Sequence, residues 1–360
     1  MAHARLSNEQ LEEGSGLDEE GFREFCIKRK LNEQSIQAHL GVLREFETFV
    51  NENEGKRNLA NATACDLQSF VEEMMKNQKN TEENFLALLR YGRFVGNKQV
   101  EIAVLELLDG SDVLENLSET MRQMIGETRR NEVFEGINLP RLGTHPRDKP
   151  RIVKKFMENT EFKLGREKCR EILSTGPHAV PKEEYLADKK MFHESQSVDE
   201  FLEKLREEYI DMLENHRNDK TLYFTQEIDE EVLDYVRNTP TCQVGVRDGD
   251  TVYVTKIPYN AKKYLHETDE KKKRYDYCHC PWVREAILSD LRISPDFCYC
   301  SAAFEKRLWD VVFDQPVKAD IVETVLNGGT ICKFAIHIPK EFLKPVPAPS
   351  QANPQCNSRP

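Results

Sequence analysis

Five of the chain's ten cysteines fall within one C-terminal stretch, in a pattern that can do chemistry. Cys278 and Cys280 form one Cys-x-Cys pair, Cys298 and Cys300 form a second pair, and Cys332 follows further along. In an extended segment, the side chains of residues i and i+2 point to the same side, so each pair is expected to present two sulfurs to a single binding partner. That binding partner could be a metal ion, a partner disulfide or a substrate. The spacing of the cysteines does not distinguish among these three.

Zinc is the cofactor that this pattern favours. Zinc takes four ligands from Cys, His and carboxylate side chains, and the five thiols together with His279 provide more than enough donors. The N-terminus carries no apolar segment of the secretory type, so we expect a cytoplasmic location in which thiols stay reduced. A Cys-x-Cys pair is less diagnostic than a Cys-x-x-Cys knuckle. The alternative is that some of these thiols are buried packing residues.

The bulk properties describe a water-compatible chain with an acidic balance. The 360 residues carry a formal net charge of −12, with 39% hydrophobic and 32% charged residues. No apolar run reaches the length of a membrane span, so no membrane partner is expected. The negative charge argues against broad nucleic-acid binding, but it leaves a local basic face open. The run Lys271–Arg274 either meets an anion or is a solvated charge run.

Helical periodicity dominates the first part of the chain. Within residues 35–50, apolar residues recur on one helical stripe, namely Ile36, Leu40, Leu43, Phe46 and Val50. Asn32 or Ser35 is expected to cap this helix. Thr63 and Asp66 predict a capping box at the start of the next helix, and residues 81–94 predict another.

The segments 31–46, 59–70 and 81–94 together resemble the core-binding domain of tyrosine recombinases. In phage integrases this domain is a SAM-like helical bundle that helps to clamp DNA, and the resemblance covers roughly residues 21–110. No His-x-x-Arg followed by a suitable Tyr occurs downstream, so no recombinase activity is expected. DNA binding and reuse as a protein-interaction module both stay open. The Glu-rich, mixed charge of these helices weakens the DNA interpretation.

Period-two patterns appear beyond residue 240. Residues 243–247 and 251–257 predict a hairpin around Asp248-Gly249, and residues 317–325 and 330–338 predict a second hairpin. The polar stretch 260–274 is expected to be an exposed loop. A helix over residues 301–313 is expected to point the following side chains inward: Phe304, Leu308, Val311 and Val312. His337 is expected to have a surface or structural role.

These patterns together predict an α+β multidomain fold: an all-α SAM-like bundle, a helical middle and a C-terminal α+β domain with antiparallel hairpins. Pro140, Pro146 and Pro150 place the main boundary near Leu139–Arg151. The expected segments are a disordered leader (1–20), the SAM-like bundle (21–110), a helical connector and linker (111–150), a helical region (151–240), a Cys-rich α+β domain (241–338) and a disordered Pro-rich tail (339–360).

Residues 220–338 resemble the vinyl-reductase-type small-molecule-binding domain and are also similar to thiazoline-carboxylate-hydrolase-like proteins. The resemblance is carried mainly by Glu323, Gly328 or Gly329, Cys332 and Phe334. In the sensor members of the first family, a Cys-rich site with one Glu holds zinc, which implies Glu323 and Cys332 as ligands here. The cysteine that those members place three residues after the Glu is Leu326 in this chain. The remaining ligands would therefore come from Cys278, Cys280, Cys298 or Cys300.

Three functions follow from these observations. The first, which we favour, is a non-catalytic sensor or ligand-binding protein whose zinc-binding domain forms a pocket for a small molecule. The aromatic residues beside the cysteines either line this pocket or pack in the core: Tyr277, Phe297 and Tyr299. The second is a cysteine- or metal-dependent hydrolase with Cys298 or Cys300 as nucleophile and His279 as base. The third is a DNA-associated protein that retains the integrase-like bundle. A homodimer is also left open.

Overall fold

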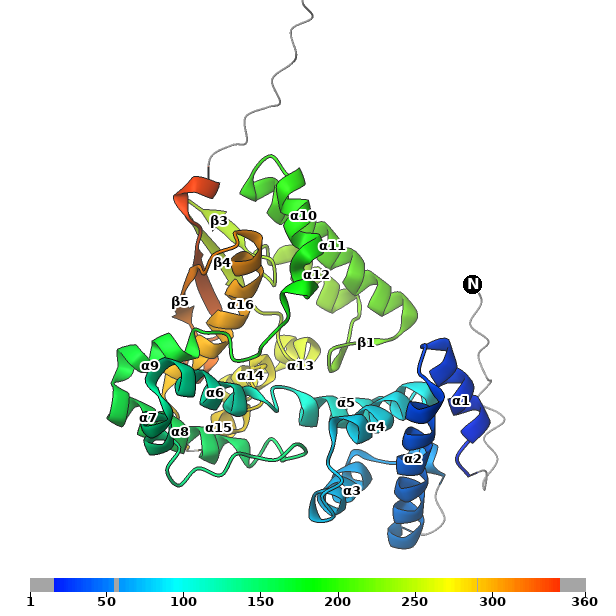
Figure 1. The fold of residues 1–360 in the computed structure, drawn as a ribbon. Helices are drawn as coiled ribbons and strands as arrows, with labels where there is room; N and C mark the ends of the chain where they lie inside the picture. Colours follow the sequence, from blue (N-terminus) through cyan, green and yellow to red (C-terminus); the bar gives the residue numbers. More distant parts are fainter. Residues whose placement is uncertain (1–15, 55–57, 290, 344–360) are drawn as a thin grey trace, which may run out of the picture.

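The computed structural model describes residues 16–54, 58–289 and 291–343 of the chain. Within these ranges the fold is α+β and multidomain, as the sequence predicts, with a first part of helices alone and a later part that holds a small antiparallel sheet. Figure 1 shows the first five helices, in blue and cyan, on one side of the molecule, and the sheet on the other. No helix in these ranges is long and apolar enough to cross a bilayer.

Five helices form the N-terminal bundle. They are α1 (Glu19–Lys28), α2 (Glu33–Glu54), α3 (Ala64–Lys76), α4 (Glu82–Val95) and α5 (Lys98–Leu108), with the 3-10 turn η1 (Leu59–Asn61) before α3. The predicted stripe of α2 is buried along its length, from Ile36 to Val50. Phe46 of this stripe stacks on Phe70 of α3 at a ring separation of 4.8 Å, which joins the two helices.

The predicted caps of this bundle are confirmed. Asn32 Oδ1 accepts a hydrogen bond from the amide of Ser35 at 2.8 Å. The amide of Thr63 donates to Asp66 Oδ2 at 2.7 Å, and the amide of Asp66 donates to Thr63 Oγ1 at 3.2 Å. This reciprocal pair satisfies two amides that have no partner inside the helix, so the start of α3 is fixed by its own sequence.

A helical middle follows the bundle. Its elements are α6 (Val113–Ile125), α7 (Glu127–Val133), α8 (Lys149–Leu164), α9 (Arg166–Leu173), η2 (Lys182–Tyr185), α10 (Leu186–Glu194), α11 (Val198–Asp219), the two-stranded ladder β1 (Leu222–Tyr223) and β2 (Gln226–Glu227), and α12 (Glu230–Asn238).

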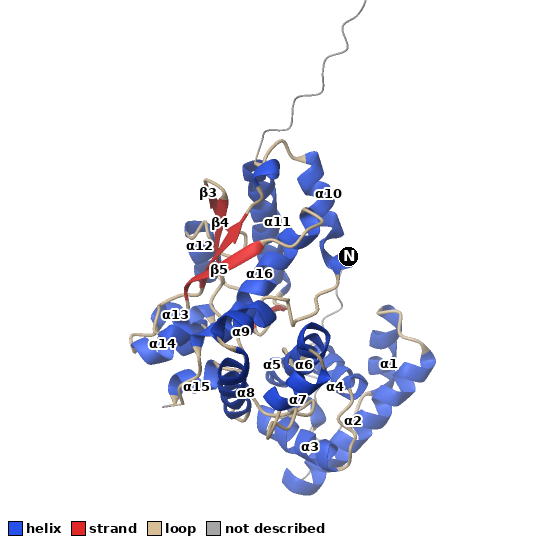
Figure 2. Ribbon diagram, turned by 60° about the vertical axis from the view of Figure 1, so that its left-hand side comes forward, coloured by secondary structure: helices blue, strands red, loops and turns tan. Residues whose placement is uncertain are grey.

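The last part contains an antiparallel sheet in the order β3-β4-β6-β5. Its elements are β3 (Val246–Asp248), β4 (Thr251–Thr255), α13 (Ala261–His266), α14 (Glu270–Tyr277), α15 (Arg284–Leu288), η3 (Pro295–Cys298), α16 (Tyr299–Val312), β5 (Lys318–Glu323), η4 (Val325–Asn327), β6 (Lys333–His337) and η5 (Lys340–Phe342). Both predicted hairpins are present, and β4 pairs with β6 to join them, with Val252 opposite Ile336. Figure 2 shows α11 and α16 beside this sheet.

One hydrophobic core runs from α6 to β6 and includes Val113, Phe201, Trp309 and Phe334. The N-terminal bundle has a separate core. The change from one core to the other falls between Leu107 and Val113. Near the expected boundary at Leu139–Arg151, Leu142 packs against the core of the bundle and Val153 belongs to the larger core. A third, smaller cluster joins α11, α12 and the start of α13.

Two local expectations are wrong. Most of the stretch 260–274 is helical and not an exposed loop, because Asn260 caps α13 and Asp269 caps α14 through their side chains. Phe304 of α16 is 39% exposed and does not point into the core. The expected leader overlaps α1 from Glu19 onward. Residues 1–15 and 344–360, which hold most of the expected leader and tail, lie outside the described residues.

Candidate functional site

The five cysteines of the predicted site, which we call the thiol cluster, are positioned by four different elements. Cys278 is the C-cap of α14, and Cys280 follows it in the turn before α15. Cys298 ends η3, Cys300 lies in the first turn of α16, and Cys332 comes directly before β6. Cys278, Cys300 and Cys332 are buried, and Cys280 and Cys298 are partly buried. The fold therefore gathers thiols that are distant in sequence in one region of the larger core.

The thiol cluster is held in its protonated form. Burial raises the pKa of Cys278 and of Cys280 to about 12, and a neighbouring thiol adds to each shift. Burial likewise raises the pKa of Cys298 well above its ordinary value, and the nearby Cys332 is the next cause. Neighbouring thiols are thus a secondary cause of these shifts, after burial.

Proximity in this arrangement does not amount to a metal centre. In the described parts of the chain, no group of three or more His, Cys, Asp or Glu side chains is arranged to hold a metal ion. The expectation that both Cys-x-Cys pairs are extended is wrong for the second pair. Cys298 and Cys300 lie across the start of a helix, where residues i and i+2 point to different sides. Zinc binding by these residues stays a prediction.

Glu323, the carboxylate that the resemblance implied as a ligand, holds the turn between β5 and β6. Its Oε1 accepts hydrogen bonds from the amide of Thr330 at 2.5 Å, from the hydroxyl of Thr330 at 3.2 Å and from the amide of Ile331 at 3.3 Å. Gly329 lies against this carboxylate, since a Cβ at that position would come within 2.4 Å of Glu323 Cγ. Glu323 therefore stabilises its own hairpin through these hydrogen bonds to Thr330 and Ile331.

The structure pairs Cys300 with a histidine that the sequence analysis did not consider. Cys300 Sγ lies 3.3 Å from His178 Nε2, within hydrogen-bond distance for sulfur. His178 belongs to the segment between α9 and η2, which is tied down where Pro177 O accepts from Asn116 Nδ2 at 2.9 Å and Val180 O accepts from Arg307 Nε at 3.1 Å. Burial lowers the pKa of His178 to about 4, with Lys256 as the next cause. The imidazole is therefore neutral at pH 7, and the raised pKa of Cys300 keeps the resting proton on sulfur.

A buried ion pair lies beside this thiol and imidazole. Lys256 Nζ is 3.2 Å from Glu305 Oε1, and the two side chains are 14% and 9% exposed. Burial alone lowers the pKa of Lys256, but Glu305 and Cys332 outweigh burial and leave that pKa above its ordinary value. Lys256 also lowers the pKa of Cys300 against the larger effect of burial. A fixed cation thus faces the region where a thiolate would form.

His279, the base proposed from the sequence, is engaged elsewhere. Its Nε2 donates to the carbonyl of Ile257 at 2.5 Å, and its ring packs edge-on against Tyr259 at 5.5 Å. Burial lowers the pKa of His279 to about 3. His279 is therefore a neutral structural histidine in this arrangement. His337 is likewise structural, since its Nε2 lies 2.8 Å from Asp320 Oδ2.

The three aromatic residues proposed as pocket lining are placed in different surroundings. Tyr277 and Phe297 are fully buried members of the larger core. The hydroxyl of Tyr277 donates to the carbonyl of Lys256 at 2.6 Å, which fixes the backbone that carries the buried lysine. Tyr299 is partly buried, and the guanidinium of Arg170 lies 5.4 Å from its ring centroid.

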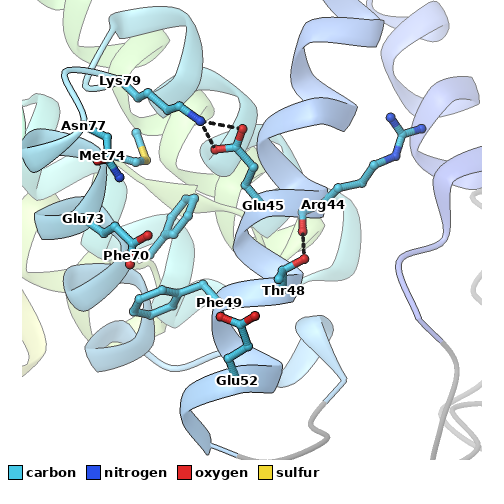
Figure 3. Close-up of a pocket in the computed structure, with 10 residues that line it drawn as sticks. All are labelled: Arg44, Glu45, Thr48, Phe49, Glu52, Phe70, Glu73, Met74, Asn77 and Lys79. Carbon is cyan, nitrogen blue, oxygen red and sulfur yellow. Dashed lines mark hydrogen bonds and ion pairs between the residues drawn. The ribbon is translucent and has the colours of Figure 1, made fainter.

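The N-terminal bundle carries a pocket of its own between α2 and α3, with a volume of about 460 Å³. Figure 3 shows Phe49, Phe70 and Met74 on its inner side, with acidic side chains and the Glu45–Lys79 ion pair around it. Lys79 Nζ is 2.8 Å from Glu45 Oε1. The acidic rim opposes the approach of a phosphate backbone.

Comparison with known families supports one of the two resemblances. Residues 20–91 match the family described as phage integrase, N-terminal SAM-like domain. The match covers the N-terminal bundle from α1 into α4 and holds neither the thiol cluster nor His178. No curated protein and no solved structure matches the chain. The resemblance of residues 220–338 to vinyl-reductase-type domains receives no support from these comparisons.

Proposed function

We propose that the C-terminal part of this protein is a cysteine-dependent hydrolase that acts on a small molecule. Cys300 is the nucleophile and His178 is its base. The observation that carries the proposal is the 3.3 Å approach of His178 Nε2 to Cys300 Sγ, because a nucleophile within hydrogen-bond reach of a neutral base is the minimal unit of thiol catalysis. The sequence favoured a non-catalytic role because it offered no such pair.

The surroundings of the pair suit this chemistry. Cys300 lies in the first turn of α16, where the positive end of the helix dipole favours a thiolate. Lys256 adds a cation, and Asp112 favours the protonated form of His178. Each group favours one of the two charges that proton transfer creates, the thiolate for Lys256 and the imidazolium for Asp112, and disfavours the other charge. Burial keeps the resting pair neutral.

The reaction on this proposal begins when His178 Nε2 accepts the thiol proton and the sulfur of Cys300 bonds to an electrophilic carbon. The imidazolium then returns its proton to the leaving group as the carbon–heteroatom bond breaks. Water, deprotonated by the same imidazole, attacks the thioester, and cleavage of the carbon–sulfur bond returns the thiol. Lys256 offers its positive charge to the anion that develops in each addition step.

An activated ester tests this proposal without knowledge of the natural substrate. Treatment with p-nitrophenyl acetate is expected to acetylate Cys300, as located by peptide mass spectrometry. His178→Gln should slow this acetylation about 100-fold, because a positioned base contributes rate factors of that order. Cys65→Ala, which removes an exposed cysteine of the N-terminal bundle, is the matched control. Acetylation that stays equally fast in His178→Gln, or that never reaches Cys300, contradicts the proposal.

We also retain zinc-supported ligand binding as a second candidate, because the mutual influence of Cys278, Cys298 and Cys332 on their pKa values favours a soft cation. Their side chains would have to rearrange, since the described donors do not converge. Elemental analysis of protein purified under reducing conditions decides between the candidates. About one zinc per chain, lost in Cys298→Ser and Cys332→Ser, supports a zinc-bound sensor, and metal-free protein excludes it.

For the N-terminal bundle we propose a protein-interaction role in preference to tight DNA binding, with a second copy of this chain as one candidate partner. Several of its cations are already paired with carboxylates, among them Arg44 with Glu19 at 2.6 Å and Lys79 with Glu45 at 2.8 Å. A cation that already pairs with a carboxylate neutralises DNA phosphates poorly, so its binding releases few of the counterions that surround DNA. A tight duplex shift at physiological salt contradicts this proposal, and light scattering tests the homodimer.

A further inference from the structure

Another pocket lies where the first turns of α14, the C-terminal end of α15 and η4 meet. Its volume is about 740 Å³, against about 460 Å³ for the pocket of the bundle. It is therefore large enough for a molecule of several heavy atoms. Neither Cys300 nor His178 lines it.

Three cations line this pocket from two segments of the chain: Lys271 and Arg274 on α14, and Arg292 after α15. In the part of the chain that the structure describes, none of the three forms an ion pair with a carboxylate. Arg274 Nε donates to the backbone carbonyl of Glu270 at 3.2 Å, and its Nη1 lies beside Gly328, where a Cβ would be 3.5 Å away.

The carboxylate that caps α14 does not neutralise this set. Asp269 is the N-cap of α14, and its Oδ1 accepts from the amides of Lys271 and Lys272 at 3.0 and 2.9 Å. The Lys272 side chain is exposed and does not line the pocket. Lys271 and Arg274 are three residues apart, so they lie on one face of the helix. The positive charge of this face is thus directed into a concavity.

The rest of the pocket is largely apolar. Ile287 and Ile293 are buried core residues, and Leu291 and Leu326 are partly buried and pack against the same core. A ligand that satisfies both parts has an anionic head and a hydrocarbon body. A simple inorganic anion would leave the apolar wall without a partner, and an apolar molecule would leave the three cations unused.

We propose that this pocket binds a small amphiphilic anion, a carboxylate or a phosphate monoester on a short aliphatic chain, with Lys271, Arg274 and Arg292 holding the head. The proposal stands independently of the hydrolase function. It gives the run Lys271–Arg274 a role beyond a solvated surface, through the two of its members that face the pocket.

Calorimetric titration of the full chain with hexanoate, hexyl phosphate, hexylammonium and inorganic phosphate tests the proposal. Hexanoate or hexyl phosphate is expected to bind at least tenfold more tightly than both hexylammonium and inorganic phosphate. The tighter of the two anions identifies the head group. Equal weak binding of all four probes overturns the proposal.

Variants locate the binding on the chain. Arg274→Gln should weaken the preferred anion about tenfold or more, since a hydrogen bond to a charged group contributes about that much. Leu326→Ala should weaken the six-carbon anion but leave inorganic phosphate unchanged. Lys272→Gln, which removes an exposed charge from the same helix, is the control and should bind as the parent does. An equal loss of affinity for the anion in Arg274→Gln and Lys272→Gln would mean that net charge alone attracts the anion. That result would overturn the proposed site.

Discussion

His178 and His279 show at the scale of the residue why burial and partner matter more than residue type. Both imidazoles are held neutral, with pKa values of about 4 and about 3. His279 donates its Nε2–H to the carbonyl of Ile257, whereas His178 Nε2 lies beside the thiol of Cys300. Only His178 therefore has a partner whose proton it can take. The sequence indicated Cys300 but could not indicate His178, because 121 intervening residues separate the two.

The low pKa values of the two histidines predict acid sensitivity. A histidine whose folded pKa lies below its unfolded value binds a proton more readily in the unfolded state, so its contribution to stability is complete above about pH 6.5 and is lost as pH falls. Each histidine should cost about 1.4 kcal/mol per pH unit below that point. The free energy of unfolding, measured by urea denaturation, should therefore fall between pH 7.5 and pH 5.

A variant isolates this contribution. His279→Gln, compared with the parent protein at both pH values, should show a smaller loss between pH 7.5 and pH 5 by about 2 kcal/mol. The comparison cancels other titrating groups, including Asp109, where burial raises the pKa to about 6 and the effect has the opposite sign. An identical loss in variant and parent would show that His279 titrates normally.

At the scale of the element, local sequence determined the N-terminal helices well. The stripe of α2 and the cap of α3 depend on neighbours within one or two helical turns, and both were predicted correctly. The sequence predicts a loop over residues 260–274 because the charged residues there show no apolar helical period. The structure has short helices in this stretch, which Asn260 and Asp269 cap. The second Cys-x-Cys pair was mistaken for extended chain because spacing alone does not distinguish a strand from a helix start.

The capping box of α3 predicts a measurable cost. Thr63→Ala removes the hydroxyl that accepts the amide of Asp66 at 3.2 Å, and it should lower the free energy of unfolding by about 1 kcal/mol. Thr48→Ala in the middle of α2 is the matched control. Its hydroxyl donates to the carbonyl of Arg44 within the helix, and its loss should change stability by less than about 0.5 kcal/mol. Equal effects of the two changes would refute the capping role.

At the scale of the whole molecule, polar contacts join the N-terminal bundle to the region of the thiol cluster. Glu106 of α5 accepts from Arg284 Nη2 at 2.9 Å and from the hydroxyl of Tyr259 at 2.7 Å. The guanidinium of Arg284 is buried and lies 3.8 Å from the Tyr259 ring centroid. Trp282 Nε1 donates to the carbonyl of Gly110 at 2.9 Å, between the two cores. Sequence patterns could not foresee these contacts, because they join residues that share no local period.

This junction should be more sensitive to mutation than an exposed one. Glu106→Gln removes the carboxylate that pairs with the buried guanidinium of Arg284 and should cost about 2 kcal/mol or more in thermal or urea unfolding. Lys98→Gln breaks a more exposed ion pair between the bundle and the later chain, Lys98–Glu227, whose side chains are 36% and 66% exposed. Its cost should stay below about 1 kcal/mol. A larger cost for Lys98→Gln would contradict the importance of the buried junction.

The central claim is that His178 acts as the base for Cys300, and the pH dependence of Cys300 alkylation tests it most directly. The rate with iodoacetamide is measured by peptide mass spectrometry from pH 5 to pH 9, with exposed Cys65 as the internal control. With His178 as base, the rate at Cys300 should be nearly level above about pH 6, because the imidazole is already neutral. In His178→Gln it should rise about tenfold per pH unit, as for a thiol that must first ionise, while Cys65 behaves alike in both proteins. A tenfold rise per pH unit in the parent protein as well would contradict the account.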